Sequence, residues 1–588
     1  MAVLLLSAIV GYLCFYGAVI KKDSAFFPVL FVSFVSIVEY FFGFAGRVDI
    51  GAYVIAGVGI VLIPVSVYKA RRSILGTILS PAVLFMAVGI VWAYVITRGT
   101  GLSHSDDFNH WYRICKILYY DNTYPKTGEI LYPSYVPGTA CWNVFVTRFI
   151  SFDVPDCFFA QSLINLSCCC SLISCLSKVS KISSKVILYI GVSLLSIMLC
   201  AFDISTYALL VDCTLGLLAL SAAVYVIFAG KDLKWDDLAV LSVISTYTVL
   251  VKQSGLLMVL FVLLFLVRRN EVSVLKMRRY LLLMVAVPLL ISGLYSIWGH
   301  IYYPDIATSS QALSLERFGS FAEVKTPQMV FNIICNTILL ALPVLSDYPQ
   351  PNALWVSFFL LLVFEYKKLK KFPSFVYVVG VLALYLVGLM GTYIFSMSNL
   401  EVSYMASYDR YYGTVAVYLA GLIFYMVFDY IASAETLPLR SVLATFVILT
   451  ILTGIVLDPL YIRGYSFYHP REAFTDVAWK AICSYAPENT SYSDLTYAVV
   501  WDDEIVFDDG LYGTKVQQVA EVYLRSDHVQ IYTFNYVGQI GLSEEDKKSL
   551  EDADVLIVVG EIDDRLDPLK EFTASGTVVS GVNDLFLK

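Results

Sequence analysis

The stretch FPVLFVSFVSIVEYFFGFAG, residues 27–46, contains a single charged side chain, that of Glu39. A helix needs about 20 mainly apolar residues to cross the hydrocarbon core of a bilayer. This stretch therefore predicts a membrane-spanning helix. Comparable apolar runs lie on both sides of it, from Met1 to about Leu457, with short basic or turn-like loops between them. The sequence predicts an α-helical polytopic membrane protein.

The composition of the whole chain supports this class. Of the 588 residues, 58% are hydrophobic and only 15% are charged, whereas roughly a quarter of the residues in an ordinary soluble domain are charged. Residues 458–588 carry 10 basic and 24 acidic residues, a net charge of −14, while residues 1–457 carry 30 basic and 24 acidic residues, a net charge of +6. We expect a transmembrane domain over 1–457 and a separate soluble domain over 458–588. A basic surface for nucleic acid is absent.

Apolar segments predict the positions of the spans. They lie at residues 2–20, 27–46, 50–68, 79–97, 157–177, 186–202, 205–229, 237–251, 254–268, 279–297, 329–346, 353–366, 374–396, 412–430 and 440–457. Lys and Arg in short loops mark the cytoplasmic side. If every basic cluster lies on the cytoplasmic side, segment 329–346 cannot cross the membrane and is instead a re-entrant or interfacial hairpin. About 14 spans then remain. The alternative is that 329–346 is a true span. One basic cluster would then lie on the outer side, against the rule that Lys and Arg in short loops mark the cytoplasmic side.

This topology places the loop 98–156, the loop 298–328, the short loop 397–411 and the tail on the outer side of a cell membrane. Within the first loop, apolar positions from Phe108 to Tyr120 recur at helical spacing, which predicts an amphipathic helix at the membrane surface. Cys115 and Cys141 share this loop, and a disulfide between them remains open. Most other cysteines lie in apolar runs, where Cys behaves as a small hydrophobe.

An acidic pair, Asp106 and Asp107, opens this helix beside His104, His110 and Trp111. A carboxylate at a helix N-terminus can simply cap free N–H groups. Alternatively, one carboxylate can act as a general base on an acceptor hydroxyl while its neighbour positions the substrate. Both interpretations stay open on the residues alone.

The arrangement resembles the GT-C superfamily of membrane glycosyltransferases, in particular the relatives of protein O-mannosyltransferases and the aminoarabinose transferase of lipid A. Members carry an acidic pair in the first large outer loop, followed by an amphipathic helix and a return segment similar to YPSYVPG, which begins here at Tyr132. The resemblance implies that Asp106 is the catalytic base. Asp107 stands where many members have Glu.

Two more segments carry the resemblance. SYDRYYGTVAVYL, residues 407–419, is similar to an E-x-R-Y-x-x-P-x-x-P segment of the family, with Asp409, Arg410 and Tyr411 matching and the family's prolines missing. TVLVKQSGLLMVL, residues 248–260, is similar to a K-x-S/T-G-L element that contains Lys252. The resemblance implies a polyprenyl-phosphate-linked sugar as donor, an extracytoplasmic glycan or cell-wall acceptor, and inversion at the anomeric carbon.

Arg410 and Lys252 suit the phosphate of such a donor, because Arg presents a planar fork and Lys a compact charge. The alternatives are an ion pair of Arg410 with Asp409 and snorkelling of Lys252. Glu39 and Asp212 fall in the outer halves of spans and are candidates for lining a substrate cavity or for pairing with buried cations. His300 is a candidate hydrogen-bond donor near the phosphate.

The tail alternates helix-like and strand-like stretches, which predicts a small α/β domain. We expect strands near 496–501, 505–507 and 529–534, helices near 471–485, 515–524 and 543–551, and further strands in ADVLIVVG and TVVSGV. The acidic runs 502–504 and 508–509 fit strand-flanking turns or, less simply, a metal site. No cofactor is expected, although a divalent cation stays open.

The sequence thus predicts a membrane glycosyltransferase. Two alternatives remain, a polymerase of lipid-linked polysaccharide and a flippase or transporter. A transporter should show internal repeats with broken helices, and no such repeat is evident in the sequence. An enzyme of this class requires that Asp106 faces Arg410 and Lys252 across one outer cavity.

Overall fold

The computed structural model describes most of the helical part and selected segments of the tail. It describes residues 1–456 apart from 99, 103, 105, 127–129, 131, 203–207, 232, 271–273, 303–314, 344–348, 369–372 and 435–438, and beyond them 496–501, 520, 529–533, 537, 543–553, 555–559 and 577–580. The chain divides into two compact units. The first contains Met1–Arg98 and Tyr132–Phe467, and the second contains Gly99–Leu131 and Tyr468–Lys588.

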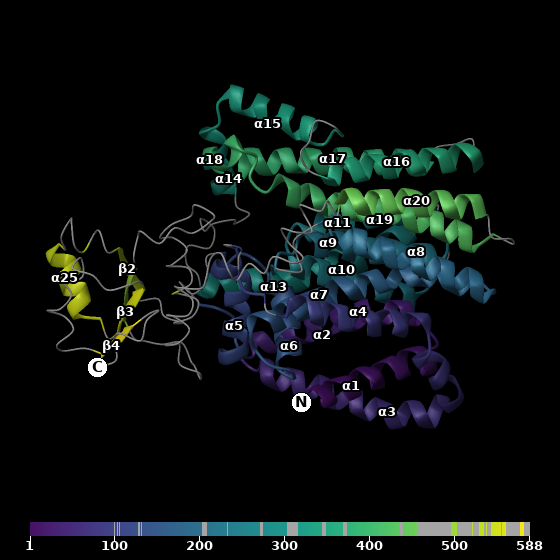
Figure 1. Ribbon diagram of the computed structural model, residues 1–588, viewed down its shortest axis with the longest axis horizontal. Helices are drawn as coiled ribbons and strands as arrows, with labels where there is room; N and C mark the ends of the chain where they lie inside the picture. Colours follow the sequence, from purple (N-terminus) through teal and green to yellow (C-terminus); the bar gives the residue numbers. More distant parts are fainter. Residues whose placement is uncertain are drawn as a thin grey trace. The chain divides into compact units, whose positions relative to one another are not determined.

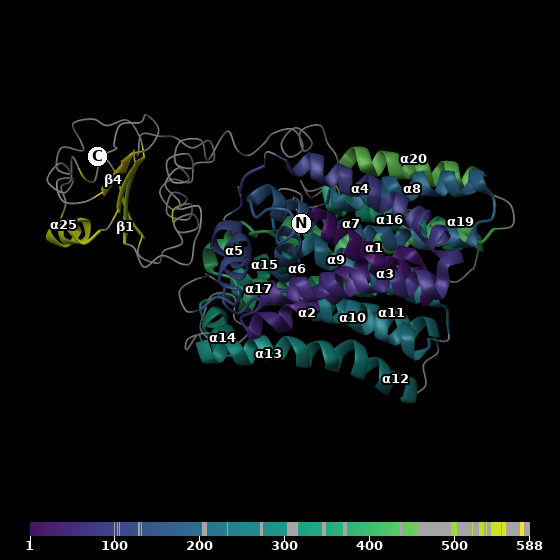
Figure 2. The ribbon, with the colours of Figure 1, turned by 90° about the horizontal axis from the view of Figure 1, so that it is seen from below.

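The first unit is a bundle of helices that run side by side along the horizontal axis of Figures 1 and 2. Its helices are α1 (Ala2–Cys14), η1 (Phe15–Val19), η2 (Ser24–Phe26), α2 (Phe27–Phe44), α3 (Val48–Ile78), α4 (Pro81–Thr97), α6 (Gly138–Thr147), α7 (Val154–Cys170), η4 (Ser171–Lys178), α8 (Ile182–Cys200), α9 (Asp212–Ala229), α10 (Trp235–Val251), α11 (Gly255–Asn270), α12 (Val274–Leu281), η5 (Leu282–Ala286), α13 (Val287–Tyr302), α14 (Leu315–Glu323), α15 (Pro327–Leu340), α16 (Pro349–Lys368), α17 (Pro373–Phe395), α18 (Asn399–Ser403), α19 (Tyr408–Ala432) and α20 (Leu439–Val456).

A helix stands at each predicted apolar segment, so the prediction of an α-helical polytopic membrane protein is confirmed. Within the described residues, nine helices are long and apolar enough to cross a membrane, and three shorter apolar helices accompany them. Several of these helices expose large apolar side chains on the outside of the bundle. Exposed apolar side chains in such numbers fit a surface surrounded by lipid.

The predicted hairpin at 329–346 contains one helix among the described residues. This helix, α15, has 14 residues, which corresponds to a length of about 21 Å. It is therefore shorter than a full bilayer span. It packs along α17.

The structure also contains a helix that the sequence analysis left as part of a loop. Residues 138–147 form α6, in which every side chain is buried, and this helix packs against α2 and α7. Because it is buried on all sides, it lacks the amphipathic periodicity that identifies a surface helix. Its ten residues are also too few for a span.

The centre of the bundle is the pair α9 and α19, which are buried along most of their lengths. They cross closely because small residues face each other. A Cβ atom at Gly216 of α9 would lie only 2.5 Å from the carbonyl oxygen of Thr414 on α19. Close backbone approach through small residues is typical of helix pairs in membranes.

The second unit contains a parallel four-stranded sheet, drawn in yellow in Figure 1. Its strands are β1 (Tyr497–Trp501), β2 (Val529–Thr533), β3 (Val555–Val559) and β4 (Thr577–Ser580), in the order β2-β1-β3-β4. Helix α25 (Glu544–Glu551) precedes β3. Strand β1 is central and fully buried, as parallel strands covered on both faces usually are. These elements confirm the α/β character expected of the tail.

The same unit includes the predicted amphipathic helix, which forms as η3 (Asp107–Trp111) and α5 (Tyr112–Asp121). The remaining tail elements predicted near 471–485 and 505–507, and nearly all of 515–524, lie outside the described residues.

Candidate active site

Three charged side chains from positions far apart in the sequence meet in the first unit. Nζ of Lys252 lies 3.0 Å from one carboxylate oxygen of Asp212, and a guanidinium nitrogen of Arg410 lies 3.0 Å from the other oxygen. The side chains are nearly enclosed, with exposed fractions of 13% for Lys252, 3% for Asp212 and 12% for Arg410. Two cations thus share one anion, which leaves a net charge of +1.

Helix ends explain why these groups meet. Asp212 is the first residue of α9, where the helix dipole favours a carboxylate. Arg410 lies in the first turn of α19, where the same effect disfavours a cation. Asp212 therefore compensates Arg410, and the predicted alternative partner, Asp409, is not bonded to it. Gly216 and Thr414 follow Asp212 and Arg410 by four residues each, so the closest crossing of the two helices lies one turn below the ion pair.

Lys252 lies in the tight turn between α10 and α11. The N–H of Gly255 donates to the carbonyl of Lys252 at 2.8 Å, which closes the turn. A Cβ atom at Gly255 would lie 2.2 Å from the carbonyl oxygen of Thr248, so this turn requires glycine. The side chain of Gln253 donates to the carbonyl of Ser134 at 3.0 Å, which ties the turn to the segment before α6.

Aromatic rings surround the Lys252 ammonium. Its nitrogen lies 5.7 Å from the ring centre of Tyr135 and 5.3 Å from that of Tyr411, within the range of cation–π attraction. Burial disfavours the charged form, but the Asp212 carboxylate outweighs it, so the pKa of Lys252 is raised above its ordinary value. The ion pair with Asp212 thus favours the charged form of Lys252.

A cavity of about 270 Å³ opens beside these groups. Its polar lining includes Asp212, Lys252, Tyr385, Thr392 and Tyr411. Its apolar lining comes from Leu215, Leu257, Met258 and Leu389. A cavity with a cationic end and an apolar side suits an amphiphilic ligand with an anionic head.

The cavity is bordered by two helices whose outer faces are apolar. On α11 the exposed side chains include Leu260 and Leu264, and on α17 they include Leu384 and Val387. A Cβ atom at Gly388 of α17 would lie in ordinary contact with Leu257 of α11, at 3.6 Å. An alkyl chain lying along this pair of helices could therefore extend from the cavity into lipid.

The acidic pair lies in the second unit. The Asp106 side chain is about three-quarters buried, and its carboxylate lies 3.8 Å from Nδ1 of His104, which also accepts the N–H of Asp106 at 3.1 Å. Asp107 and His110 are fully buried, and the rings of His110 and Trp111 lie 4.6 Å apart. Asp106 is the more exposed carboxylate of the pair and is therefore the better placed to meet a substrate.

Four predicted site residues of the first unit do not line the cavity. The first is Arg410, whose guanidinium reaches the lining through its bond to Asp212. Glu39 is fully buried in α2, and its carboxylate lies where a side chain at Gly51 of α3 would stand. His300 is exposed near the end of α13. Tyr132 stacks near Tyr135, with their ring centres 5.3 Å apart, and so lies behind a residue that does line the cavity.

Sequence analysis missed several lining residues, among them Tyr135, Gln253, Tyr385, Thr392 and Ser396. One signal could have identified the last three. Tyr385, Gly388 and Thr392 in α17, and Ser396 directly after it, recur every three or four residues in a mainly apolar stretch, which places them on one face. Within the described residues, no three His, Cys, Asp or Glu side chains lie close enough to hold a metal ion. The acidic runs 502–504 and 508–509 lie outside those residues.

Comparisons with known proteins give a distant structural likeness. Two crystal structures of ArnT from Cupriavidus metallidurans align with the chain, one bound to undecaprenyl phosphate and one in the apo state. Both are 13% identical with a TM-score of 0.44; the first alignment covers 85% of this chain and 89% of ArnT, and the second covers 84% and 88%. No protein-family model matches the sequence, and no curated protein does. The likeness concerns the fold alone.

Proposed function

We propose that this protein is a membrane glycosyltransferase that moves a sugar from a polyprenyl-phosphate donor to an extracytoplasmic glycan or cell-surface acceptor. The observation that supports it most is the meeting of Lys252 and Arg410 on Asp212 beside an amphiphilic cavity. Both cations come from the segments that resemble GT-C motifs, although 157 residues separate them in the sequence. A membrane site with excess positive charge favours an anionic headgroup.

In the proposed reaction, the acceptor hydroxyl oxygen attacks the anomeric carbon of the donor sugar. The bond between that carbon and the phosphate oxygen breaks, and its electron pair leaves with the lipid phosphate. Asp106 takes the hydroxyl proton. Because this is one displacement, the anomeric configuration inverts. Arg410 and Lys252 stabilise the charge that develops on the departing phosphate, and Tyr411 holds Lys252 in place. Two cations at the leaving group let the transfer proceed without a metal ion.

The decisive variant is Asp106→Ala in the full-length protein, reconstituted with a radiolabelled polyprenyl-phosphate sugar and a cell-surface glycan fraction. We expect transfer to fall by about 10²–10⁴-fold, the usual contribution of a general base, while donor binding is retained. Arg410→Gln should instead weaken donor binding. Asp121→Ala, at the other end of α5, is the matched control and should keep its activity.

Unchanged transfer in Asp106→Ala would refute the catalytic assignment. Movement of the labelled lipid across the vesicle membrane, with no transfer in any variant, would favour the flippase alternative. Loss of donor binding in Asp106→Ala would instead show that this carboxylate holds the donor.

A further inference from the structure

A second cavity, of about 330 Å³, lies at the opposite end of the bundle from the candidate active site. Lys22 at its edge pairs with Asp236 and Asp237 at the start of α10, whereas Lys252 follows the end of the same helix. We call it the inner-end cavity, because the predicted cytoplasmic loops gather around it. Its walls come from the turn before η2, the end of α3, the start of α4, η4 and the start of α8.

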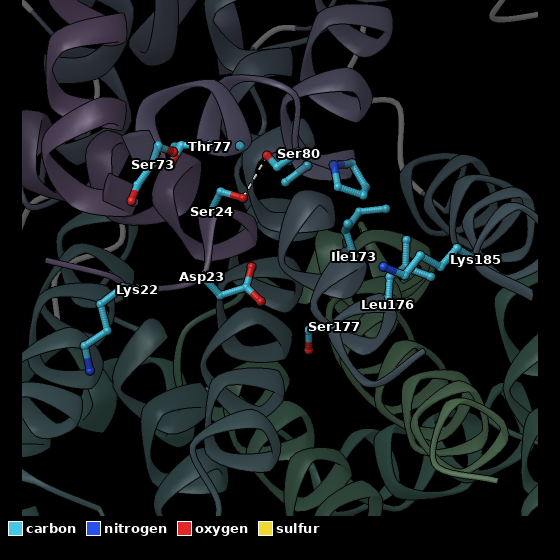
Figure 3. Close-up of a pocket in the computed structure, with 14 residues that line it drawn as sticks. Lys22, Asp23, Ser24, Ser73, Thr77, Ser80, Ile173, Leu176, Ser177 and Lys185 are labelled. Carbon is cyan, nitrogen blue, oxygen red and sulfur yellow. Dashed lines mark hydrogen bonds between the residues drawn. The ribbon is translucent and has the colours of Figure 1, made fainter. Parts of the chain in front are cut away.

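The inner-end cavity is rich in hydroxyl groups. Ser24, Thr77, Ser80 and Ser177 line it, and the hydroxyl of Ser24 donates to that of Ser80 at 2.8 Å (Figure 3). Ser80 also caps α4, a helix of 17 residues, by accepting the N–H of Val83. A helix N-terminus and a set of hydroxyl donors both favour an anionic group.

One lysine of the cavity is available to such a group. Figure 3 shows the ammonium end of Lys185 directed toward the centre of the cavity, whereas Lys22 turns away toward its two aspartates. The backbone N–H of Lys185 donates to the carbonyl of Lys181. Within the described part of the chain, its ammonium group has neither a hydrogen-bond nor an ion-pair partner. An unpaired lysine in a half-buried position is a ready partner for a phosphate.

The rim of the cavity is apolar on two sides. Next to the wall from α3, the side chains of Leu75 and Leu79 are 66% and 72% exposed, and next to Lys185 those of Ile182 and Val186 are 76% and 52% exposed. Side chains of this kind face acyl chains, whereas the cavity itself is polar. The inner-end cavity thus lies where a lipid headgroup meets its tails.

A carboxylate inside the cavity narrows the range of headgroups that can bind there. Asp23 lines the wall, and one of its oxygens accepts the N–H of Ala25 at 2.9 Å. This carboxylate would repel a bare phosphate placed against it. It would accept hydrogen bonds from hydroxyl groups attached to a phosphate. The lining therefore fits a headgroup that carries both a phosphate and free hydroxyl groups.

We propose that the inner-end cavity binds the headgroup of an anionic phospholipid that carries free hydroxyls, with the phosphate at Lys185 and the start of α4 and the hydroxyls at Asp23. Phosphatidylglycerol is the simplest lipid of this class. This site is separate from the proposed transfer reaction, and its test does not depend on that reaction.

The test uses full-length protein in detergent and native mass spectrometry to measure apparent dissociation constants of short-chain phosphatidylglycerol, phosphatidic acid and phosphatidylcholine. We expect phosphatidylglycerol to bind about 10-fold more tightly than phosphatidylcholine. Both lipids carry a phosphate anion, but only phosphatidylglycerol offers hydroxyl groups to Asp23, and one hydrogen bond to a charged group contributes about this factor. Lys185→Gln should weaken the binding of phosphatidylglycerol and of phosphatidic acid by about 10-fold, because both lose the partner of their phosphate. Lys181→Gln is the matched control, because it removes an exposed charge one turn away, outside the cavity lining.

Asp23→Asn tests the proposed hydroxyl-binding end of the cavity. It keeps the hydrogen bond from the N–H of Ala25 that caps η2, since Asn caps helices as well as Asp does. This variant should tighten phosphatidic acid and lose the preference for phosphatidylglycerol over it. Equal losses in Lys185→Gln and Lys181→Gln would overturn the proposal in favour of general surface attraction. Competition by inorganic phosphate as strong as that by phosphatidylglycerol would overturn the lipid assignment in favour of a free-anion site.

Discussion

Asp212 is the residue on which the candidate active site depends. It forms an ion pair with each of two nearly enclosed cations, Lys252 and Arg410. Breaking a buried ion pair by removing one partner costs far more than the pair contributes, because the remaining charge is left uncompensated. Here the cost is larger still, since two like charges would remain side by side.

We therefore predict that Asp212→Asn lowers the free energy of unfolding by about 3–5 kcal/mol, measured by thermal unfolding in detergent. Added polyprenyl phosphate should restore more stability to this variant than to the wild-type protein, because its phosphate can replace the missing carboxylate. Asp409→Asn, which removes a half-buried carboxylate that pairs with neither cation, should change stability little. A stable Asp212→Asn protein would show that the two cations do not need a shared anion.

At the scale of the elements, the crossing of α9 and α19 sets the distance between Asp212 and Arg410. Gly216 and Thr414 form the contact one helical turn away. Any side chain at Gly216 would press on the α19 backbone, and backbone cannot move aside as a flexible side chain can. The helices would have to separate or shift.

Gly216→Ala should accordingly reduce donor binding and transfer, because it moves Arg410 away from Asp212. Gly380→Ala in α17 is the matched control, since nothing lies within 4 Å of a Cβ atom there. That substitution should stabilise its helix by about 0.5–1 kcal/mol and leave transfer unchanged. Comparable activity in both variants would contradict the role given to the crossing.

Much at this scale could be predicted from the sequence. The lengths of the apolar runs located the helices, and short runs of β-branched and other apolar residues located strands such as β1 and β3. Burial in lipid or in a sheet leaves this direct trace in the residue types. Helix α6 left no such trace, since a short helix buried on all sides has no polar face. The pairing of Arg410 with Asp212 could not be predicted either, because it depends on how helices far apart in sequence cross. Tyr135 and Gln253 lie in loops, whose course no periodicity reveals.

At the scale of the whole molecule, the parallel sheet is the core of the second unit. Strand β1 lies between β2 and β3, and Val500 on it belongs to a buried cluster with Ala498, Tyr532 and Leu556. The same unit includes the acidic pair, in which Asp107 is the first residue of η3 and Asp106 directly precedes it. Damage to the sheet should therefore affect chemistry that depends on Asp106.

Val500→Asp places an unpaired charge in this cluster and should unfold the sheet. We expect rapid proteolysis within the tail, loss of transfer, and an intact helical unit, detected as a protease-resistant membrane fragment. Glu544→Gln, at a side chain that is 90% exposed, should remain resistant. If Val500→Asp retains transfer, the tail sheet is not required for catalysis.

The discontinuous make-up of the second unit bears on how the protein is synthesised. Residues 99–131 leave the ribosome early, but their companions in the unit begin at Tyr468. At about 5–20 residues per second, the early segment waits roughly 20–90 seconds for the rest. During that interval the membrane helices are inserted one after another. The proposed activity would then arise only after the later segment has been synthesised, so a product truncated before Tyr468 would occupy the membrane without modifying anything.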